Sequence, residues 1–264
     1  MELTIYQVDA FAEKAFEGNP AAVIPLQEWL PDEMLQAIAM ENQLSETAYF
    51  VPSEEGLELR WFTPTIEVDL CGHATLATAH VLFTEFGGRL AIGNQIPFQT
   101  RSGELKVQRV EGRYAMDFPA DPPLPEDEGR DRVEEALGTP VVDLLRGRHD
   151  LVAILESEKE VAELDPDIRA IGQLPARGIL VSAPGDQFDF VSRCFFPQSG
   201  IDEDPVTGSA HTTLAPYWAG KLEKSNLNAR QISRRGGNVI CLWEGDRVML
   251  VGGAVTFLRG TIQI

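Results

Sequence analysis

The chain has 264 residues, at or beyond the usual limit for one compact core, so its length favours two domains. Its 41 acidic and 22 basic side chains give a formal net charge of -19, and no basic cluster is longer than Arg234-Arg235. Nucleic-acid binding is therefore not expected, because a polyanion requires a basic face.

The first residues, Met1 to Tyr6, have neither a basic segment followed by an apolar run nor a small-residue cleavage site. No apolar stretch approaches the roughly 20 residues that cross a bilayer. Three cysteines at unrelated spacings (Cys71, Cys194 and Cys241) favour free thiols in a reducing compartment. We therefore expect a cytoplasmic protein that makes no membrane contact.

In chain order, the first half alternates strand and turn signals before one long helix. A turn at Gly18-Asn19-Pro20 separates two strands, and an amphipathic helix starts at Pro31. We predict a helix over Gly72 to Phe86 that ends at Gly87-Gly88. Its residues are apolar on nearly all sides, so we expect the helix to be buried on every side. The remaining expected strands are 3–8, 21–24, 48–51, 57–62, 105–110 and 113–118.

A connector rich in proline and acidic residues, 119–131, marks the expected domain boundary. The second half repeats the pattern, with one principal helix over 208–220 among many strands, and strand 254–264 could rejoin the first domain. This order predicts an α+β fold with an N-terminal domain over 1–118 and a C-terminal domain over 119–253.

The two principal helices begin with similar residues. Gly72-His73-Ala74-Thr75 resembles Gly208-Ser209-Ala210-His211, which suggests duplicated domains. Neither Cys71 nor Gly72 is a strong N-cap, so the first N–H groups of helix 72–86 are free for an anionic ligand.

Glu46 is the acid with the strongest case for chemistry. Neither face of the predicted strand 46–51 looks solvated, so its carboxylate must be paired, protonated or functional. A buried carboxyl group can act as a general acid or base. The alternative is a strand-end glutamate whose head reaches water.

Three other side chains each have a functional and a structural interpretation. Asp204 could be a second ionisable group or a residue near a helix cap. His73 could hydrogen-bond a substrate as a neutral imidazole, because nearby N–H groups disfavour its charged form, or it could be a satisfied core histidine. Cys71 could be a reactive thiol stabilised by the helix N-terminus, or a small buried filler.

The sequence gives little support for a metal-binding or nucleotide-binding site. His73 and His80 lie on one helix face but roughly 10 Å apart along the axis, too far to share one metal ion. The sequence contains no HExxH, paired CxxC or phosphate-binding glycine motif. We therefore expect neither a metal nor a cofactor, and a metal hydrolase ranks third among the functions considered.

The motifs together closely resemble the PhzF-like family of phenazine-biosynthesis isomerases, within the diaminopimelate epimerase-like fold. They run in family order from residue 9 to about 237: Asp9-Ala10-Phe11 with Gly18-Asn19-Pro20, Leu44-Ser45-Glu46-Thr47, Phe62-Thr63-Pro64 with Glu67 to Thr75, Asp204 to His211, and Gln231 to Gly237.

The resemblance implies two similar domains, each a β-barrel-like sheet around a central helix, with the active site between them. It implies that Glu46, His73 and Asp204 are catalytic and that Asn19, Gly72, Gly208 and Ser209 bind substrate. It is compatible with a homodimer. Cys71 matches the first of the two cysteines of the epimerases proper, but no cysteine stands near Asp204 in the sequence, so a two-thiol racemase is not supported.

These observations predict a cofactor-independent isomerase or epimerase that moves a proton on a small anionic carboxylate. Glu46 would transfer the proton, and helix N-termini would hold the anion. The rival hypothesis is a catalytically silent small-molecule-binding or scaffold protein that retains the fold.

Overall fold

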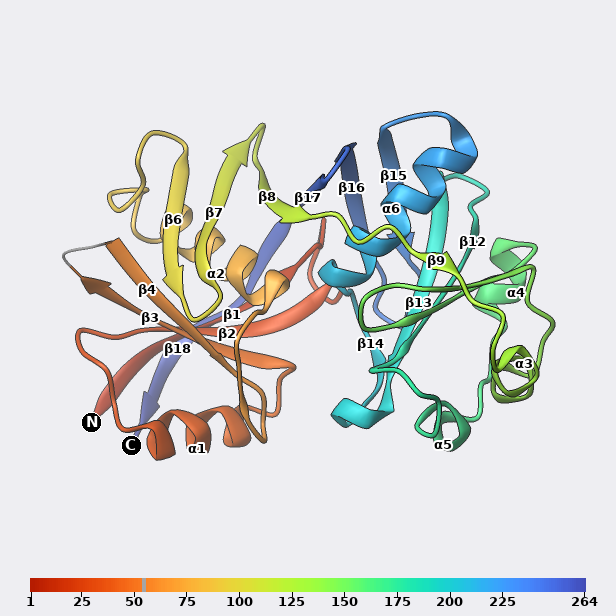
Figure 1. Ribbon diagram of the computed structural model, residues 1–264. Helices are drawn as coiled ribbons and strands as arrows, with labels where there is room; N and C mark the ends of the chain where they lie inside the picture. Colours follow the sequence, from red (N-terminus) through yellow and green to blue (C-terminus); the bar gives the residue numbers. More distant parts are fainter. Residues whose placement is uncertain (54–55) are drawn as a thin grey trace. The chain divides into compact units, whose positions relative to one another are not determined.

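The computed structural model describes residues 1–53 and 56–264, and these form two compact units (Figure 1). Unit 1 consists of Met1–Asp117 with Val251–Ile264, and unit 2 of Phe118–Leu250. Both mix strands and helices, which confirms the predicted α+β class. No helix of the described residues has the length and apolar character of a membrane span.

Unit 1 surrounds one central helix with strands, and a second helix covers the outside. Its elements are β1 (Glu2–Ala10), β2 (Asn19–Pro25), α1 (Asp32–Asn42), β3 (Glu46–Ser53), β4 (Gly56–Phe62), β5 (Glu67–Val68), α2 (Gly72–Thr84), β6 (Gln95–Thr100), β7 (Gly103–Val110), β8 (Arg113–Pro119) and β18 (Ala254–Gln263).

The pairing of β1, β2 and β3 determines which residues meet at one end of unit 1. β1 is antiparallel to both β18 and β2, so the last strand of the chain lies beside the first. β2 and β3 run parallel, with Ala21 opposite Glu46, and β4 adds antiparallel to β3. The first residues of β2 and β3 therefore lie at the same end of the sheet.

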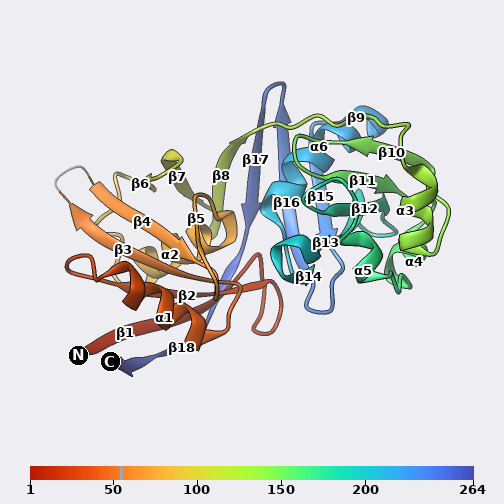
Figure 2. The same cartoon turned by 60° about the horizontal axis from the view of Figure 1, so that its bottom comes forward.

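The central helix α2 is buried along almost its whole length, because residues 73–83 are all buried. It packs against β1, β2, β3 and β18, as Figure 2 shows within unit 1. It ends two residues earlier than the sequence predicts. Gly87 and Gly88 are both left-handed, and the Gly88 N–H bonds back to the Leu82 carbonyl, so the chain already leaves the helix at Glu85.

The loop between β1 and β2 explains the first family motif. The Asp9 carboxylate accepts a hydrogen bond from the Phe16 N–H at 2.9 Å. Gly18 has φ +67°, and a Cβ there would lie 2.1 Å from the Ala10 carbonyl oxygen. Only glycine fits this close approach, and the turn delivers Asn19 to the start of β2.

Unit 2 has the second long helix and four short ones. Its elements are β9 (Leu124–Pro125), α3 (Arg130–Leu137), β10 (Asp143–Arg146), β11 (Leu151–Ile154), α4 (Glu158–Ala162), α5 (Ile168–Ile171), β12 (Ile179–Pro184), β13 (Phe190–Phe196), the 3₁₀ helix η1 (Pro197–Ser199), β14 (Ile201–Asp204), α6 (Gly208–Leu222), β15 (Asn226–Gln231), β16 (Gly237–Glu244) and β17 (Arg247–Gly252).

Helix α6 packs against β15 and β16 (Figure 2), and Trp218 anchors it. The Trp218 ring stacks on Phe190 with 5.9 Å between centroids, and its indole N–H donates to the Ser182 hydroxyl at 2.9 Å. The prediction that Gly220 ends this helix is wrong. Glu223 takes the left-handed C-cap conformation instead, and its N–H bonds to the Ala219 carbonyl.

Candidate active site

The start of α2 and the start of β3 bring two family residues into contact. His73 Nε2 and Glu46 Oε2 lie 3.0 Å apart, and their side chains are only 9% and 12% exposed. The Ser45 hydroxyl donates to Asn19 Oδ1 at 2.9 Å, so the buried Asn19 lies at the same end of the sheet. In unit 1 the structure thus gathers Asn19, Glu46, Gly72 and His73.

The contact between Glu46 and His73 leaves polar atoms incompletely satisfied. Glu46 Oε2 and His73 Nε2 are both buried, and among the described residues neither has a well-aligned hydrogen-bond partner. Their separation pairs them only as charges. Native proteins rarely leave buried polar atoms in this state, and those that do occur mark functional groups or sites that water or a ligand completes.

A third side chain extends the contact on the other side of the imidazole ring. Cys71 Sγ lies 3.5 Å from His73 Nδ1, within hydrogen-bond distance for sulfur. The thiol, the imidazole and the carboxylate form one compact cluster, which we call the Cys71–His73–Glu46 relay, with one ligand atom of each residue within 4.8 Å of the others. The sulfur contacts Nδ1 of the ring and the carboxylate contacts Nε2.

The relay changes two expectations about protonation. Burial alone would lower the pKa of His73, but the neighbouring Cys71 and Glu46 outweigh burial and raise it well above its usual range. The prediction of a neutral His73 considered only the N–H groups of its own helix. Burial, reinforced by the charge of Glu46, raises the pKa of Cys71 to about 11, which favours the thiol and does not support the activated-thiolate interpretation.

Glu46, Cys71 and His73 also each offer one metal-ligating atom, and these atoms lie within 4.8 Å of one another. Nδ1 of His73 faces the sulfur and Nε2 faces the carboxylate. A metal ion bound by this cluster would have to displace the proton of the Cys71 thiol, because the thiolate is the ligand.

The second histidine of α2 is structural. His80 Nδ1 contacts the Tyr114 hydroxyl at 3.0 Å, and Nε2 contacts the Thr256 hydroxyl at 2.9 Å. Burial and the charge of Arg109 lower the pKa of His80 to about 4. With both nitrogens engaged, His80 is a neutral core residue.

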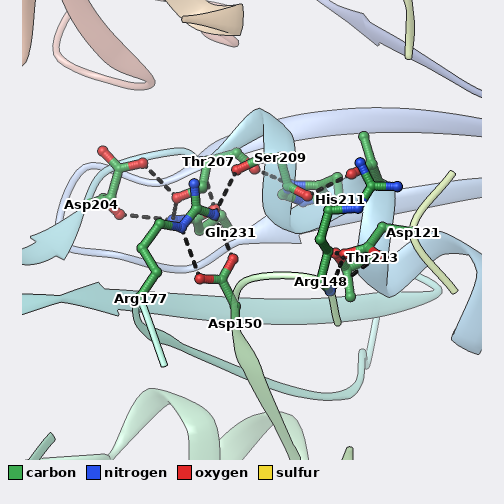
Figure 3. A network of polar contacts seen from close by, with 11 residues as sticks. Asp121, Arg148, Asp150, Arg177, Asp204, Thr207, Ser209, His211, Thr213 and Gln231 are labelled. Atoms are coloured by element: carbon green, nitrogen blue, oxygen red, sulfur yellow. Dashed lines mark hydrogen bonds and ion pairs between the residues drawn. The ribbon is translucent and has the colours of Figure 1, made fainter. Parts of the chain in front are cut away.

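In unit 2, a network of polar contacts holds the turn before α6 (Figure 3). Asp204 Oδ2 accepts from the Thr207 hydroxyl at 2.5 Å. Thr207 occupies the N-cap position, yet its side chain does not cap the helix. Asp204 is therefore not the N-cap itself, and it binds the hydroxyl that would otherwise serve there.

Gln231 connects the last residue of β15 to this turn. Its Oε1 accepts from the Thr207 N–H at 2.8 Å, and its Nε2 donates to the Asp204 carbonyl at 2.7 Å. Two residues on, Ser233 donates to the Pro205 carbonyl at 2.7 Å and accepts from the Gly236 N–H. The segment from Gln231 to Gly237 thus supports the turn that carries Asp204.

The first turn of α6 starts at Gly208, and Ser209 lies beside an arginine (Figure 3). Arg177 makes two hydrogen bonds to the buried Asp150 and reaches Ser209 Oγ at 3.4 Å. Packing does not require glycine at 208, since a Cβ there would meet only Leu250, at 3.8 Å.

The sequence alone did not identify several residues of these networks. Gln231 belongs to a recognised motif but had no predicted role, and no pattern around Asp150 or Arg177 indicated a function. Cys194 of β13 pairs with Asp204 of β14, so a cysteine does lie near this aspartate in space. It is fully buried, and burial together with the charge of Asp204 raises its pKa well above the usual range. A two-thiol mechanism gains nothing from it.

Comparison with known proteins agrees with the motifs. A family model described as phenazine biosynthesis-like protein (PhzC-PhzF) matches residues 8–260. The chain is 50% identical over 265 residues to an uncharacterized isomerase of Pseudomonas aeruginosa, with 100% of both chains covered. It is 43% identical over 291 residues to phenazine biosynthesis-like domain-containing protein 1 of Mus musculus, with 99% of each covered.

Solved structures extend the likeness to the fold. A PhzF-family phenazine biosynthesis protein of Enterococcus faecalis is 46% identical, is covered completely in both directions and superposes with a TM-score of 0.96. A hydroxyproline epimerase from Agrobacterium vitis shares the fold alone, with 9% identity, a TM-score of 0.62 and coverage of 99% of this chain and 92% of that chain. The chain therefore belongs to the phenazine biosynthesis-like, or PhzC-PhzF, family.

Proposed function

We propose that the protein is a cofactor-independent isomerase or epimerase that moves a proton on a small carboxylate, with Glu46 as general acid and base. The observation that carries the proposal is the buried contact between Glu46 and His73, whose facing atoms lack aligned partners among the described residues. Family membership supports the reaction class, because relatives in this family are named isomerases.

The proposed chemistry needs one carboxyl group. The Glu46 carboxylate takes a proton from a carbon next to a carboxyl-bearing or unsaturated centre, and the electron pair of the C–H bond delocalises into that centre. Protonated Glu46 then returns the proton to another carbon of the same molecule, which completes an allylic shift without any redox change. Epimerisation would need a second base on the opposite face, for which Asp204 is the candidate.

His73 has a supporting role in this proposal. Its raised pKa favours the imidazolium, which pairs with the Glu46 carboxylate and orients it. The first N–H groups of α2, at Gly72 and His73, are suited to the substrate carboxylate because a helix N-terminus favours anions. Asn19, Gly208, Ser209 and Asp204 remain proposed substrate-binding or catalytic residues.

Hydrogen exchange tests the proposal. Amino acids and other small carboxylic acids are screened for binding by calorimetry, and each ligand is incubated with the protein in heavy water and followed by proton NMR. We expect Glu46→Gln to abolish incorporation of deuterium, since the amide keeps the shape but cannot accept the proton. Wild-type exchange by this variant would refute the assignment.

Glu67→Gln is the matched control, because Glu67 is 13% exposed, about as buried as Glu46, but pairs with Arg60 and Arg101. It should keep the wild-type exchange rate even if it lowers stability. Tight binding without exchange in the wild-type protein would favour the rival hypothesis of a catalytically silent binding protein.

A further inference from the structure

The imidazole of His73 touches a different partner with each nitrogen. Nε2 faces Glu46 at 3.0 Å and Nδ1 faces the Cys71 sulfur at 3.5 Å. The sulfur therefore distinguishes the two possible orientations of the ring. A ring turned by 180° would place carbon atoms against both partners and lose both contacts.

Cys71 is itself held firmly in place. It occupies the N-cap position of α2 in an extended conformation and is only 7% exposed. Its carbonyl accepts from the Thr75 N–H at 3.1 Å and from the Thr75 hydroxyl at 2.6 Å. Backbone and burial together leave the sulfur little freedom to move away from the ring.

We propose that Cys71 is a positioning residue whose thiol fixes the orientation and proton placement of His73, so that the Nε2–H group faces Glu46. The thiol does not react: it stays protonated and makes no covalent bond. The thiol either donates to a neutral Nδ1 or accepts from Nδ1–H of the imidazolium, and in both cases Nε2 keeps its hydrogen. The catalytic consequence rests on the proposed function, whereas the effect on His73 does not.

The structure argues against two simpler roles. A nucleophile or metal ligand would need a thiolate, which the burial of Cys71 and the nearby Glu46 carboxylate both disfavour. A filler would need only volume, and the contact of the sulfur with Nδ1 would then be incidental. The filler role makes a different prediction for a hydroxyl replacement, so experiment can separate it.

Nitrogen-15 NMR of the histidine side chains in the full chain tests the proposal directly. The protein has only four histidines, and a His73→Gln variant identifies the signals of His73. His80 and His211 both have a pKa of about 4, so they stay neutral between pH 6 and 8. In the wild-type protein we expect Nε2 of His73 to remain protonated across this range.

The variants separate the hydrogen bond of the thiol from its volume. Cys71→Ala should lower the titration midpoint of His73 and, above that midpoint, mix the two tautomers of the neutral ring, whereas Cys71→Ser, which keeps a donor and acceptor, should restore the wild-type pattern. Cys241→Ala is the control: this thiol is also buried and belongs to unit 2. Should Cys71→Ala fail to fold, Cys71→Val fills the space without a polar group.

A wild-type His73 spectrum in the Ala or Val variant would overturn the proposal, as would a Ser variant that behaves like Ala. In the exchange assay we expect kcat of Cys71→Ala to fall about tenfold with little change in KM, as 1.4 kcal/mol in the barrier would produce. If Glu46→Gln kept full exchange while the spectra changed as expected, the proposed function would fail and the positioning role would stand.

Discussion

Replacing Gln231 with leucine should destabilise the protein strongly, although the two side chains are similar in size. Gln231 is fully buried. It accepts from the Thr207 N–H at 2.8 Å and donates to the Asp204 carbonyl at 2.7 Å. Leucine removes both of these hydrogen bonds from buried backbone groups. At about 1–3 kcal/mol for each lost partner, the free energy of unfolding should fall by about 2–6 kcal/mol.

Urea unfolding followed by tryptophan fluorescence measures this loss, since the buried Trp218 lies in the same unit. Gln198→Leu is the matched control. Gln198 is exposed and makes one side-chain hydrogen bond, to the Leu174 carbonyl at 2.7 Å. It should cost no more than about 1.5 kcal/mol. Equal losses in the two variants would show that Gln231 does not hold the turn that carries Asp204.

Two further predictions concern unit 1. Because the folded pKa of His73 is raised, its charge stabilises the fold fully below the unfolded pKa of about 6.5 and loses that effect as pH rises through the folded pKa. The stability difference between wild type and His73→Gln should therefore shrink from pH 6 to 9 in urea titrations; a difference that grows with pH would contradict the raised pKa. Gly18→Ala should lower the melting temperature more than Gly112→Ala. Both positions have positive φ, but a Cβ at Gly18 would lie 2.1 Å from the Ala10 carbonyl oxygen, whereas a Cβ at Gly112 would meet nothing within 4 Å. Equal shifts would show that the close contact relaxes at little cost.

The sequence was most informative where the signal is local. The all-round apolar pattern from Gly72 predicted a central buried helix, and residues 73–83 are indeed all buried. Its ends were less predictable. Gly87 and Gly88 adopt positive φ about one turn after α2 has ended at Thr84, whereas Gly220 lies inside α6 without positive φ. A glycine signals a stop only where the backbone adopts positive φ, and that depends on the structure around it.

The contacts of the site depended on tertiary structure that no local pattern contains. The motifs identified Glu46 and His73 as candidates, but their contact follows from the parallel pairing of β2 with β3 and the burial of α2. The charge of His73 was misjudged for the same reason: the dipole of its own helix was visible in the sequence, and the carboxylate from β3 was not. In unit 2, Gln231 stands 27 residues after Asp204 and was recognised only as part of a motif.

The two long helices start with similar sequences but carry different chemistry. At the start of α2 the titratable imidazole of His73 contacts the Cys71 thiol with one nitrogen and the Glu46 carboxylate with the other. At the start of α6 the corresponding residues are Thr207 and Ser209, whose hydroxyls do not titrate in the physiological range. The Thr207 hydroxyl is bound to Asp204, and Ser209 is reached by Arg177. If the halves arose by duplication, titratable groups now stand at the start of α2, whereas the start of α6 has hydroxyl groups and one carboxylate, that of Asp204. This asymmetry is why the proposed reaction depends on Glu46 and why an epimerisation would depend on Asp204.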